Sequence, residues 1–279
     1  MLDQKEVNAI EKFACEMRIE VVKAIAIPGI GHIGGSLSIC DLIALLYGKV
    51  MKYDPKNPKW EDRDYLVISK GHSGPAIYSA LALKGFFPRE WLKTLNQPGT
   101  SLPSHCDRIR TPGIDMSTGS LGQGASSAAG IALGLKMLSR INTLYLILGD
   151  GECDEGEVWE MALFANHYKL TNMIAFIDDN KQQVDGFTTD IMKVDNLAGK
   201  FEAFGWFTKT VNGHAVGEIF QAIEKAKAQH DRPSLIVLET IKGKGVSIWE
   251  RKITNHNTPV SQEQVAIALG ELQKQLQSL

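Results

Sequence analysis

The sequence is poor in cysteine and has no long apolar run, and both absences narrow the class of protein. Its four cysteines (Cys15, Cys40, Cys106 and Cys153) are scattered, and no two form a CxxC pair. Cys15 and Cys40 fall within expected helices, so we expect small buried thiols, as in a reduced cytoplasmic protein. No apolar run reaches the length of a membrane span, and the N-terminus does not have the pattern of a signal peptide. A membrane protein is therefore not expected.

The chain also has no large excess of either charge. Its 279 residues include 30 Lys and Arg against 32 Asp and Glu, which gives a net charge of −2. This balance gives no electrostatic reason to expect nucleic-acid binding. Apolar residues make up 44% of the chain, enough for a sizeable core. Because no repeat or linker interrupts the sequence, we expect a single domain over residues 1–279.

Two apolar runs, 144–148 and 173–177, have the pattern of fully buried strands, and the segment 157–170 between them has helical spacing. This is a βαβ unit, in which the two strands run parallel as neighbours. Asp150 and Asn180 follow the two strands, so both should lie at the carboxyl edge of the sheet. Open α/β sheets bind their ligands at this edge.

The pair of Asp150 and Asn180 suggests a metal site. A carboxylate and an amide oxygen suit a hard cation such as Mg²⁺, which commonly also binds phosphate oxygens. The amide of Gly151, at the expected start of the helix, is placed to meet such phosphates. The sequence therefore predicts a diphosphate held through a divalent metal.

The rest of the chain continues the alternation of helices and strands. We expect further strands at 64–69, 206–210 and 235–238, and helices at 7–27, 38–47, 76–84, 125–138, 196–204, 216–229 and 261–277. Residues 96–118 are rich in Gly, Pro, Ser and Thr and form a long loop, which is more often functional than idle. This order predicts an α/β fold with a mostly parallel open sheet and helices on both faces.

Four of the seven histidines lie in loops that contain glycine or proline: His32, His72, His105 and His256. For any one of them, a structural role is as good an explanation as a functional one. Together they favour a binding site, because binding groups concentrate in loops carried by a rigid scaffold. For the other three we expect structural or exposed positions (His167, His230) and a role in a turn (His214).

Two other features have ordinary explanations, and a third is open. The glycine-rich stretch around His32 follows a helix rather than a strand, so it does not match a dinucleotide-binding loop. The acidic residues at the front of the crossover helix are explained by the helix dipole: Glu152, Glu155, Glu157 and Glu160. Lys242 and Lys244 fit a surface charge pair and a phosphate-facing pair equally well.

Several motifs together resemble the N-terminal, diphosphate-binding half of transketolase. Gly149-Asp150-Gly151, with Asn180 thirty residues after Asp150, resembles the thiamine diphosphate motif of this family. The resemblance covers essentially the whole chain, through segments 31–35, 69–72, 118–124 and 242–247. It implies a thiamine-diphosphate-binding fold and the transfer of a two-carbon ketol unit from a ketose to an aldose.

The resemblance also implies roles for individual residues. A metal ion, Mg²⁺ or another divalent cation such as Ca²⁺ or Mn²⁺, would be bound by Asp150, Asn180 and the main-chain carbonyl of Gln182. The diphosphate would meet the Gly151 amide and His72, with His256 close by. The remainder of the cofactor would contact Gly119, Leu121 and Val184.

Further implied roles concern the substrate and the subunit interface. His32, His105 and His256 would hydrogen-bond the sugar hydroxyls and move protons. Glu155 and Glu160 would join a carboxylate network that couples two active sites across the interface. Three segments depart from the usual family pattern and leave the accepted sugar open: Asn255-His256-Asn257 in place of aromatic-His-Gly, Ser104-His105-Cys106 in place of Gly-His-Pro, and Asn212-Gly213-His214 in place of Asp-Gly-His.

Single-chain transketolases are more than twice as long as this sequence. The pyrimidine-binding and C-terminal domains, with the glutamate that protonates the aminopyrimidine, are therefore expected on a separate partner chain in an α₂β₂ assembly. The substrates would be sugars or sugar phosphates. Two alternatives share the metal motif: a subunit similar to deoxyxylulose-phosphate synthase, and one that decarboxylates 2-oxoacids. A non-catalytic regulatory protein that binds the cofactor is the alternative of a different class.

Overall fold

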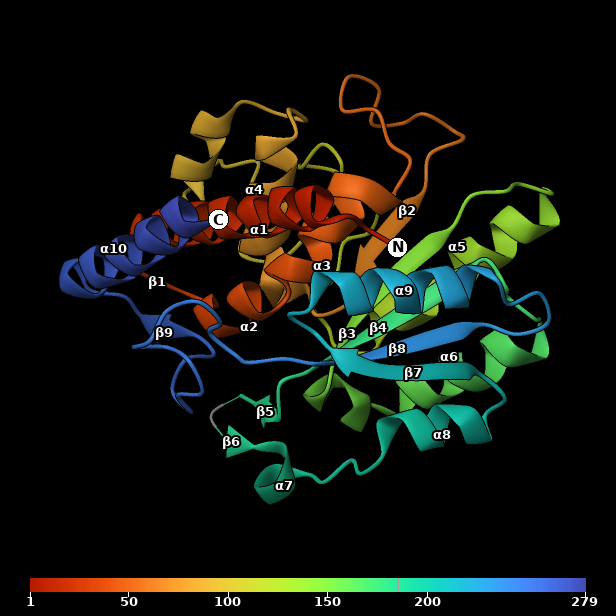
Figure 1. The fold of residues 1–279 in the computed structure, drawn as a ribbon. Coiled ribbons are helices and arrows are strands. Elements are labelled where there is room, and N and C mark those ends of the chain that lie inside the picture. Colours follow the sequence, from red (N-terminus) through yellow and green to blue (C-terminus); the bar gives the residue numbers. More distant parts are fainter. Residues whose placement is uncertain (185) are drawn as a thin grey trace.

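A five-stranded sheet organises the computed structural model, which describes residues 1–184 and 186–279 (Figure 1). The strand order is β2-β3-β4-β8-β7, and every neighbouring pair is parallel. The strands are β2 (Tyr65–Ile68), β3 (Leu144–Gly149), β4 (Met173–Asp179), β8 (Ser234–Glu239) and β7 (Phe207–Asn212). The expected parallel pairing of the strands before Asp150 and Asn180 is confirmed, because Gly149 pairs with Asp178.

Helices cover both faces of this sheet, as predicted. One face carries α1 (Gln4–Ala26), α2 (Ile33–Ser38), α3 (Cys40–Leu45), α4 (Gly74–Leu83) and α9 (Val216–Lys227), with α10 (Gln262–Ser278) packed against α1. The other face carries α5 (Gln123–Met137), α6 (Gly156–His167) and α8 (Leu197–Ala203). The smaller elements are β1 (Ile30–Gly31), β5 (Gln182–Gln183), β6 (Gly186–Phe187), α7 (Thr188–Ile191), β9 (Thr258–Pro259) and the short helices η1 (Leu46–Val50), η2 (Gly71–Ser73), η3 (Arg89–Thr94) and η4 (Gly151–Asp154).

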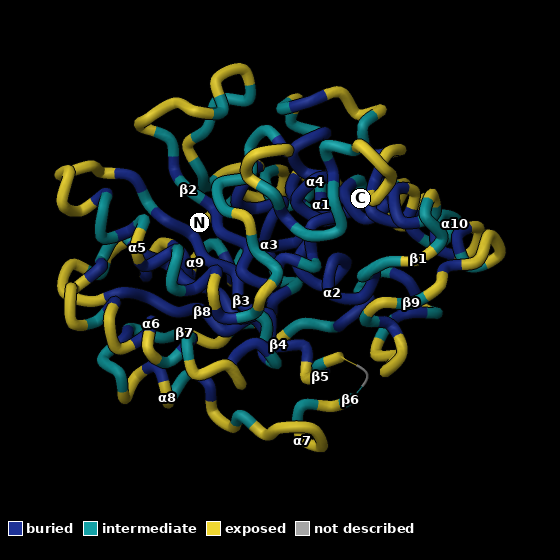
Figure 2. Tube along the Cα trace, turned by 180° about the vertical axis from the view of Figure 1, so that it is seen from behind, coloured by how far each residue is buried: buried dark blue, intermediate teal, exposed yellow. Residues whose placement is uncertain are grey.

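The three central strands β3, β4 and β8 are buried on both faces and dark blue in Figure 2, whereas the edge strand β7 is half-buried to exposed. Successive side chains of a strand point to opposite faces, so β3 contributes to two cores. Tyr145 and Ile147 join the core under α1, α3 and α4, whereas Leu144 and Leu146 join the core under α5, α6 and α8. This two-sided burial explains why β3, β4 and β8 appear in the sequence as continuous apolar runs.

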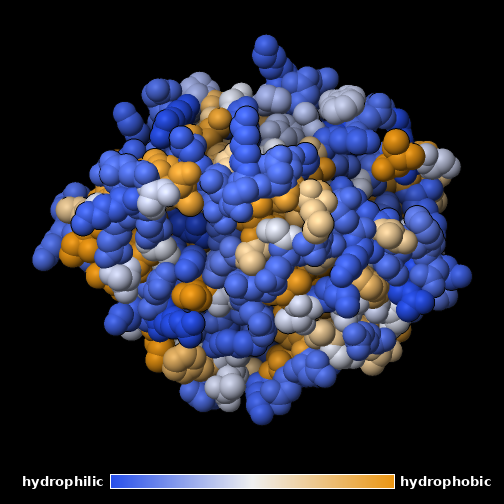
Figure 3. Space-filling view, viewed as in Figure 1, coloured by the Kyte–Doolittle hydropathy of each residue, from blue (hydrophilic) through white to orange (hydrophobic). Residues whose placement is uncertain are grey.

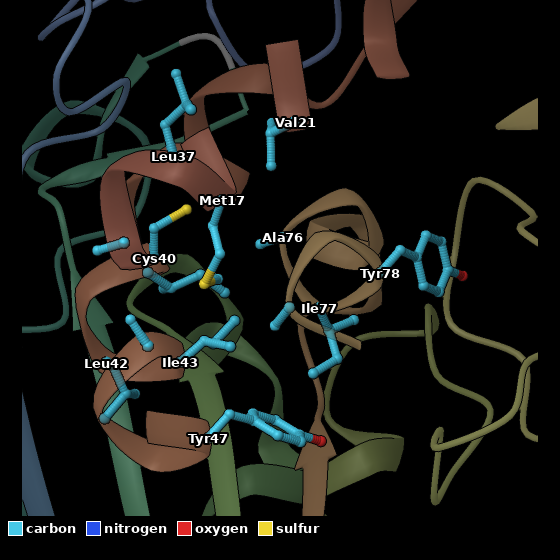
Figure 4. Packing of buried hydrophobic residues seen from close by; sticks show 14 of the residues in the cluster. Met17, Val21, Leu37, Cys40, Leu42, Ile43, Tyr47, Ala76, Ile77 and Tyr78 are labelled. Carbon is cyan, nitrogen blue, oxygen red and sulfur yellow. The ribbon is translucent and has the colours of Figure 1, made fainter. Parts of the chain in front are cut away.

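Figure 4 shows part of the first core, where Met17 of α1 lies among side chains of α3 and α4, including Cys40 and Ala76. All four cysteines are buried free thiols, which confirms the expectation for Cys15 and Cys40.

Two helices begin at capping boxes. Asp3 accepts from the Glu6 amide at 2.8 Å while Glu6 accepts from the Asp3 amide at 3.0 Å, so α1 starts three residues before the predicted position. Ser261 and Gln264 form the same arrangement before α10.

The predicted helix at 38–47 differs most from the structure. Helix α2 begins at Ile33, inside the glycine-rich stretch expected to be a loop, and the helical path then breaks at Ile39 before α3. Glycine at position 34 serves close packing, because a Cβ there would lie 2.5 Å from the Asn255 side-chain oxygen. The predicted loop at 96–118 is confirmed as free of helix and strand.

The outer surface mixes hydrophilic side chains with scattered apolar ones on the face drawn in Figure 3. In the part of the chain that the structure describes, no helix combines the length and apolarity needed to span a bilayer.

Candidate active site

A cavity of about 220 Å³ opens at the carboxyl edge of the sheet. It collects the loops that follow β2, β3, β4 and β8, together with the start of α2. Its lining includes most of the residues singled out in the sequence: His32, His72, His105, Gly119, Leu121, Asp150, Gly151, Asn180, Gln182, Val184 and His256. Side chains from distant parts of the chain thus meet at the edge where parallel sheets bind ligands.

The four loop histidines form one cluster with His32 at its centre. The ring centroid of His32 lies 5.3 Å from that of His72, 5.4 Å from that of His105 and 5.2 Å from that of His256. The rings of His72 and His256 are 4.9 Å apart. The structure therefore brings together the histidines that the sequence placed in four separate loops.

Hydrogen bonds to main-chain carbonyls hold these loops against neighbouring segments. The Gly34 amide donates to the carbonyl of Asn255 at 2.9 Å, and this joins the segments of His32 and His256. The Ser73 hydroxyl donates to the carbonyl of Gly35 at 2.9 Å, and this joins the segments of His72 and His32. The Tyr78 hydroxyl donates to the carbonyl of His105 at 3.0 Å. The histidine cluster therefore has a rigid frame.

All four histidines are held in the neutral form at neutral pH. Burial, together with the neighbouring His105 and Lys242, lowers the pKa of His32 to about 4. Burial and Lys242 lower the pKa of His256 to about 3. Burial and Lys70 lower the pKa of His72 well below its usual value, and burial lowers that of His105. A neutral imidazole can both donate and accept a hydrogen bond, which suits sugar hydroxyls.

Asp150 and Asn180 lie together on the cavity wall, as predicted. Asp150 accepts from the Gly151 amide at 2.9 Å and from the Lys181 amide at 2.6 Å, and the Asn180 side-chain oxygen accepts from the Gln182 amide at 3.1 Å. Burial raises the pKa of Asp150 to about 7, and the nearby carboxylates of Asp178 and Asp179 add to this effect.

The start of the crossover differs from the prediction in one respect. Gly151 opens the single-turn helix η4, and α6 begins five residues later at Gly156. The amide of Gly151 points to the carboxylate of Asp150 in this structure. A Cβ on Gly151 would lie only 2.4 Å from Cβ of Gln183, so glycine is needed for this close approach.

The donor set at this wall fits a hard cation. Among the described residues no three His, Cys, Asp or Glu side chains converge on a metal position. The wall instead combines one carboxylate with amide and carbonyl oxygens, the ligand types of Mg²⁺ and Ca²⁺. The side-chain oxygen of Gln182 is buried without a hydrogen-bond partner. A cation beside Asp150 would offset the effect of burial, because it stabilises the charged carboxylate and lowers its pKa.

Beneath the wall that carries Asp150 and Asn180, the buried carboxylate of Asp178 connects several segments. Its Oδ2 accepts from Lys70 Nζ at 2.5 Å, from the Ser38 hydroxyl at 2.6 Å and from Asn180 Nδ2 at 3.1 Å. Its Oδ1 accepts from the Thr240 hydroxyl. The bond from Asn180 Nδ2 fixes the orientation of that amide, whose oxygen accepts from the Gln182 amide.

The comparisons with known proteins agree with this geometry. Residues 9–275 match the family described as "Transketolase, thiamine diphosphate binding domain". The chain belongs to the transketolase family.

Two curated relatives match over almost their whole length. The chain is 52% identical to the "6-deoxy-6-sulfo-D-fructose transketolase subunit SqwG" of Clostridium sp. (strain MSTE9), covering 98% of this chain and 96% of that protein. It is 35% identical to an apulose-4-phosphate transketolase subunit of Phocaeicola vulgatus, covering 98% of this chain and 97% of that protein. These matches confirm the predicted family and the predicted type of chain, a transketolase N-terminal subunit.

The solved structures confirm the fold. Transketolase from Leishmania mexicana superposes with a TM-score of 0.91 at 30% identity, over 95% of this chain and 41% of that one. The chain thus spans less than half the length of the solved transketolases that it matches. It corresponds to their thiamine-diphosphate-binding domain.

Two residues predicted from the transketolase resemblance lie outside the cavity. Glu155 and Glu160 are exposed near the start of α6 and contribute nothing to its lining. Gly119, Leu121 and Val184 do line it. A Cβ on Gly119 would lie 3.0 Å from Cδ2 of His105, so this glycine leaves room for the ring.

Six further lining residues of the transketolase cavity were not assigned to it from the sequence: Gly35, Lys70, Gly149, Glu152, Gln183 and Lys242. The explanation of Glu152 by a helix dipole was wrong. Its carboxylate is buried and accepts from the amides of Gly122 and Gly149, both at 3.0 Å, and from the Ser69 hydroxyl. Glu152 therefore ties three cavity segments together. Lys242 is buried and donates to the carbonyl of Val184 at 3.2 Å, so it is no surface charge.

The remaining histidines have the positions expected of them. His167 and His230 are exposed. His214 lies 2.6 Å from Asp41 through Nδ1, and its Nε2 accepts from the Ile241 amide at 2.9 Å. This bond shows that Nδ1 carries the proton. His214 therefore anchors the turn after β7 to α3 and to the segment after β8.

Proposed function

We propose that this chain is the diphosphate-binding subunit of a two-subunit transketolase that moves a two-carbon ketol unit from a ketose to an aldose. The observation that carries the proposal is the cavity in which four neutral histidines face a carboxylate–amide wall. Thiamine diphosphate, when bound, supplies the carbanion chemistry for cleavage next to the ketose carbonyl, while the protein positions the reactants.

Residue roles in this proposal follow the placement in the cavity. Asp150, Asn180 and the Gln182 carbonyl would hold Mg²⁺, or Ca²⁺ or Mn²⁺ in its place. The Gly151 amide and His72 would bind the diphosphate, and Gly119, Leu121 and Val184 would contact the rest of the cofactor. His32, His105 and His256 would bind sugar hydroxyls and transfer protons at those oxygens. The lowered pKa values keep these rings neutral, so each ring can donate one hydrogen bond to a sugar hydroxyl and accept another.

A C-terminal partner chain would complete the site in an α₂β₂ assembly. Support comes from the names of the relatives, which describe them as subunits, and from the surface at α5 and α6. Glu155, Glu160 and Leu163 are exposed there, and a Cβ added to Gly130 meets nothing. Glu155 and Glu160 would then contact the partner. We also propose a cytoplasmic location, which the four free thiols support.

We further propose a sulfonated ketose, 6-deoxy-6-sulfo-D-fructose, as the donor. The support is the higher identity to the sulfofructose transketolase subunit, 52% against 35% for the apulose-4-phosphate enzyme. The metal and histidine sites would serve either donor. The distal end of the sugar would be recognised largely by the partner subunit.

Co-expression with the C-terminal subunit tests the activity. The purified complex, loaded with thiamine diphosphate and Mg²⁺, should cleave the sulfonated ketose and transfer two carbons to an aldose, as followed by mass spectrometry. The chain alone should bind the cofactor weakly and transfer nothing. A complex that binds the cofactor but cleaves no ketose would instead support a regulatory protein.

Asp150→Ala tests the metal site within that complex. Loss of the charged ligand should abolish Mg²⁺-dependent cofactor retention. Asp154→Ala, which removes an exposed carboxylate from the same turn, is the matched control and should leave retention unchanged. Unchanged cofactor affinity in Asp150→Ala, measured by calorimetry, would show that the metal binds elsewhere.

His105→Ala tests the assignment of the histidines. Donor turnover should fall, whereas the cofactor dissociation constant should stay near that of the wild type. His167→Ala, at an exposed position on α6, is the control. An equal loss of turnover and cofactor affinity would assign His105 to the cofactor.

A further inference from the structure

A second, smaller hollow lies beside the main cavity and shares His32 with it. Its volume is about 90 Å³, enough for a short stretch of a carbon chain or a few water molecules. It lies between β1, the first residues of the long loop at 96–118 and the segment just before β9. His32 thus lies between this hollow and the main cavity, which contains the residues proposed to bind the metal and the diphosphate.

Three polar side chains line this hollow: Asn96, Ser104 and Asn257. Within the described part of the chain, none of the three side chains has a hydrogen-bond partner. Polar groups that line a shared concave surface and are not bonded to the protein are free to bond a ligand. The two amides and one hydroxyl offer both donors and acceptors.

The main chain fixes the positions of these side chains. The Asn96 amide donates to the carbonyl of Leu102 at 3.0 Å, and Asn96 has a φ of 56°, which asparagine tolerates better than most residues. Ser104 precedes His105, whose carbonyl is bonded to Tyr78. Asn257 precedes Thr258, which pairs with Gly31 in the β1–β9 ribbon. The three polar groups are therefore carried by an ordered frame.

The rest of the hollow is apolar and uncharged. Ile25, Pro75 and Leu95 form apolar parts of its wall. Among the described residues that line it there is no Lys, Arg, Asp or Glu, and its one titratable group, His32, is neutral at pH 7. An anionic sugar terminus would find no charge partner here. Apolar walls with neutral hydrogen-bond donors and acceptors suit the carbon chain of a sugar, in which C–H and O–H groups alternate.

We propose that Asn96, Ser104 and Asn257 form a neutral subsite that binds the hydroxyl-bearing carbons of the open-chain ketose next to His32. This proposal rests on the proposed transketolase function and adds residues that determine its specificity. Two of the three, Ser104 and Asn257, lie in the motif segments that depart from the common family pattern. The anionic end of the sugar then lies outside this hollow, toward the partner subunit.

The test uses the assembled holoenzyme with the double variant Ser104→Ala/Asn257→Ala. Each lost hydrogen bond to a neutral group corresponds to a change of about 2- to 10-fold. The KM for the ketose donor should therefore rise about 4- to 100-fold, while kcat and the cofactor dissociation constant change less than about 2-fold. Gln97→Ala, an exposed neighbour of Asn96 that does not line the hollow, should leave all three values unchanged. An unchanged KM in the double variant, or an equal rise in Gln97→Ala, would overturn the subsite.

The variant Asn257→Asp distinguishes a hydroxyl from an anionic terminus in the hollow. A carboxylate still accepts from a sugar hydroxyl, so the donor KM should change less than about 3-fold. A sulfonate or phosphate in the hollow would be repelled, and a rise of 10-fold or more would refute the assignment to hydroxyl groups.

Measurements on the wild-type complex distinguish a failure of the subsite proposal from a failure of the proposed transketolase function. If the complex cleaves no sulfonated, phosphorylated or unmodified ketose, the transketolase proposal fails. Equilibrium binding of xylitol, an uncharged open-chain polyol, then tests the subsite by calorimetry on the same complex. Binding that is lost in the double variant supports the subsite, and no binding, or equal binding in both, overturns it.

Discussion

Lys70 Nζ lies 2.5 Å from Asp178 Oδ2 in the interior, where the two side chains are 2% and 0% exposed. The same oxygen accepts from Asn180 Nδ2, so one buried ion pair supports the amide expected to bind the metal. Lys70 follows β2 and Asp178 lies near the end of β4, with β3 between these two strands. The pair therefore joins the ends of two strands that are not neighbours, directly beneath the cavity.

Replacing Lys70 should destabilise the protein strongly. Lys70→Met leaves the Asp178 carboxylate buried without its cation, and breaking such a pair costs about 3–5 kcal/mol. Chemical denaturation monitored by circular dichroism measures the free energy of unfolding. Lys23→Met is the matched control: Lys23 pairs with Glu20 at 3.1 Å but is 49% exposed, so its loss should cost less than about 1 kcal/mol. An equal loss of unfolding free energy in the two variants would mean that the buried Lys70–Asp178 pair stabilises the protein no more than an exposed pair does.

Asp178 should act on metal binding as a positioning residue. Asp178→Asn keeps the shape of the side chain but removes the charge that holds Asn180 Nδ2 and Lys70. Groups that orient metal ligands change metal affinity about 10- to 100-fold when they are lost. Mg²⁺ titrations of cofactor binding should show this loss, with the donor KM at saturating Mg²⁺ little changed.

The control for Asp178 is its neighbour. Asp179→Asn removes the same charge one residue away, where the carboxylate pairs with the exposed Lys181. Its Mg²⁺ affinity should stay within about 3-fold of the wild type, as expected for a partly solvated pair. A similar loss in both variants would assign the effect of Asp178 to net charge rather than to the orientation of Asn180.

The sequence was sufficient for the elements whose signals are local. Buried strands appear as apolar runs, so the strands before Asp150 and after residue 172 could be placed, and parallel pairing then placed Asp150 beside Asn180. The four loop histidines could be named as candidates. Their spacing around His32 could not be predicted, because it depends on the contacts of Gly34 with Asn255 and of Gly35 with Ser73.

The sequence could not predict the burial of residues whose partners lie far away in the chain. Glu152 looked like any acidic residue near a helix start, and only the approach of Ser69 and Gly122 shows it to be a buried acceptor. Lys70 and Lys242 are charged residues next to glycines, which usually indicates the surface. Their burial follows from packing between segments far apart in the chain. No local pattern records such packing.

Acid should destabilise the cofactor-free protein through the histidine cluster. The pKa values of His32 and His256 are lowered to about 4 and 3, so these rings are neutral in the folded state down to those values. The unfolded chain takes up protons below its usual histidine pKa near 6.5, so the free energy of unfolding falls as pH drops from about 6.5 toward 4. Each ring contributes at most about 1.4 kcal/mol per pH unit, and less here because both are partly exposed.

Denaturation at pH 5.0 and 7.5 measures this pH dependence. The double variant His32→Gln/His256→Gln should show a smaller difference between the two pH values than the wild type. His230→Gln, at an exposed position, should keep the full difference. A double variant with the wild-type difference would show that the acid sensitivity arises elsewhere.

Val184 combines an unfavourable backbone conformation with a place on the cavity wall. Its φ is 45°, which is rare for a β-branched residue, and the residue is 57% exposed. Such strain costs about 1–3 kcal/mol and is found mostly at functional sites. Val184→Asn places a residue that tolerates this conformation, so the free energy of unfolding should rise by about 0.5–1 kcal/mol. The cofactor dissociation constant should rise as well, because the apolar contact is lost.

Phe187→Asn is the control, because Phe187 has a φ of −76° and does not line the cavity. Neither the free energy of unfolding nor the cofactor dissociation constant should rise in this variant. A destabilised Val184→Asn protein with unchanged cofactor affinity would refute both the strain and the contact.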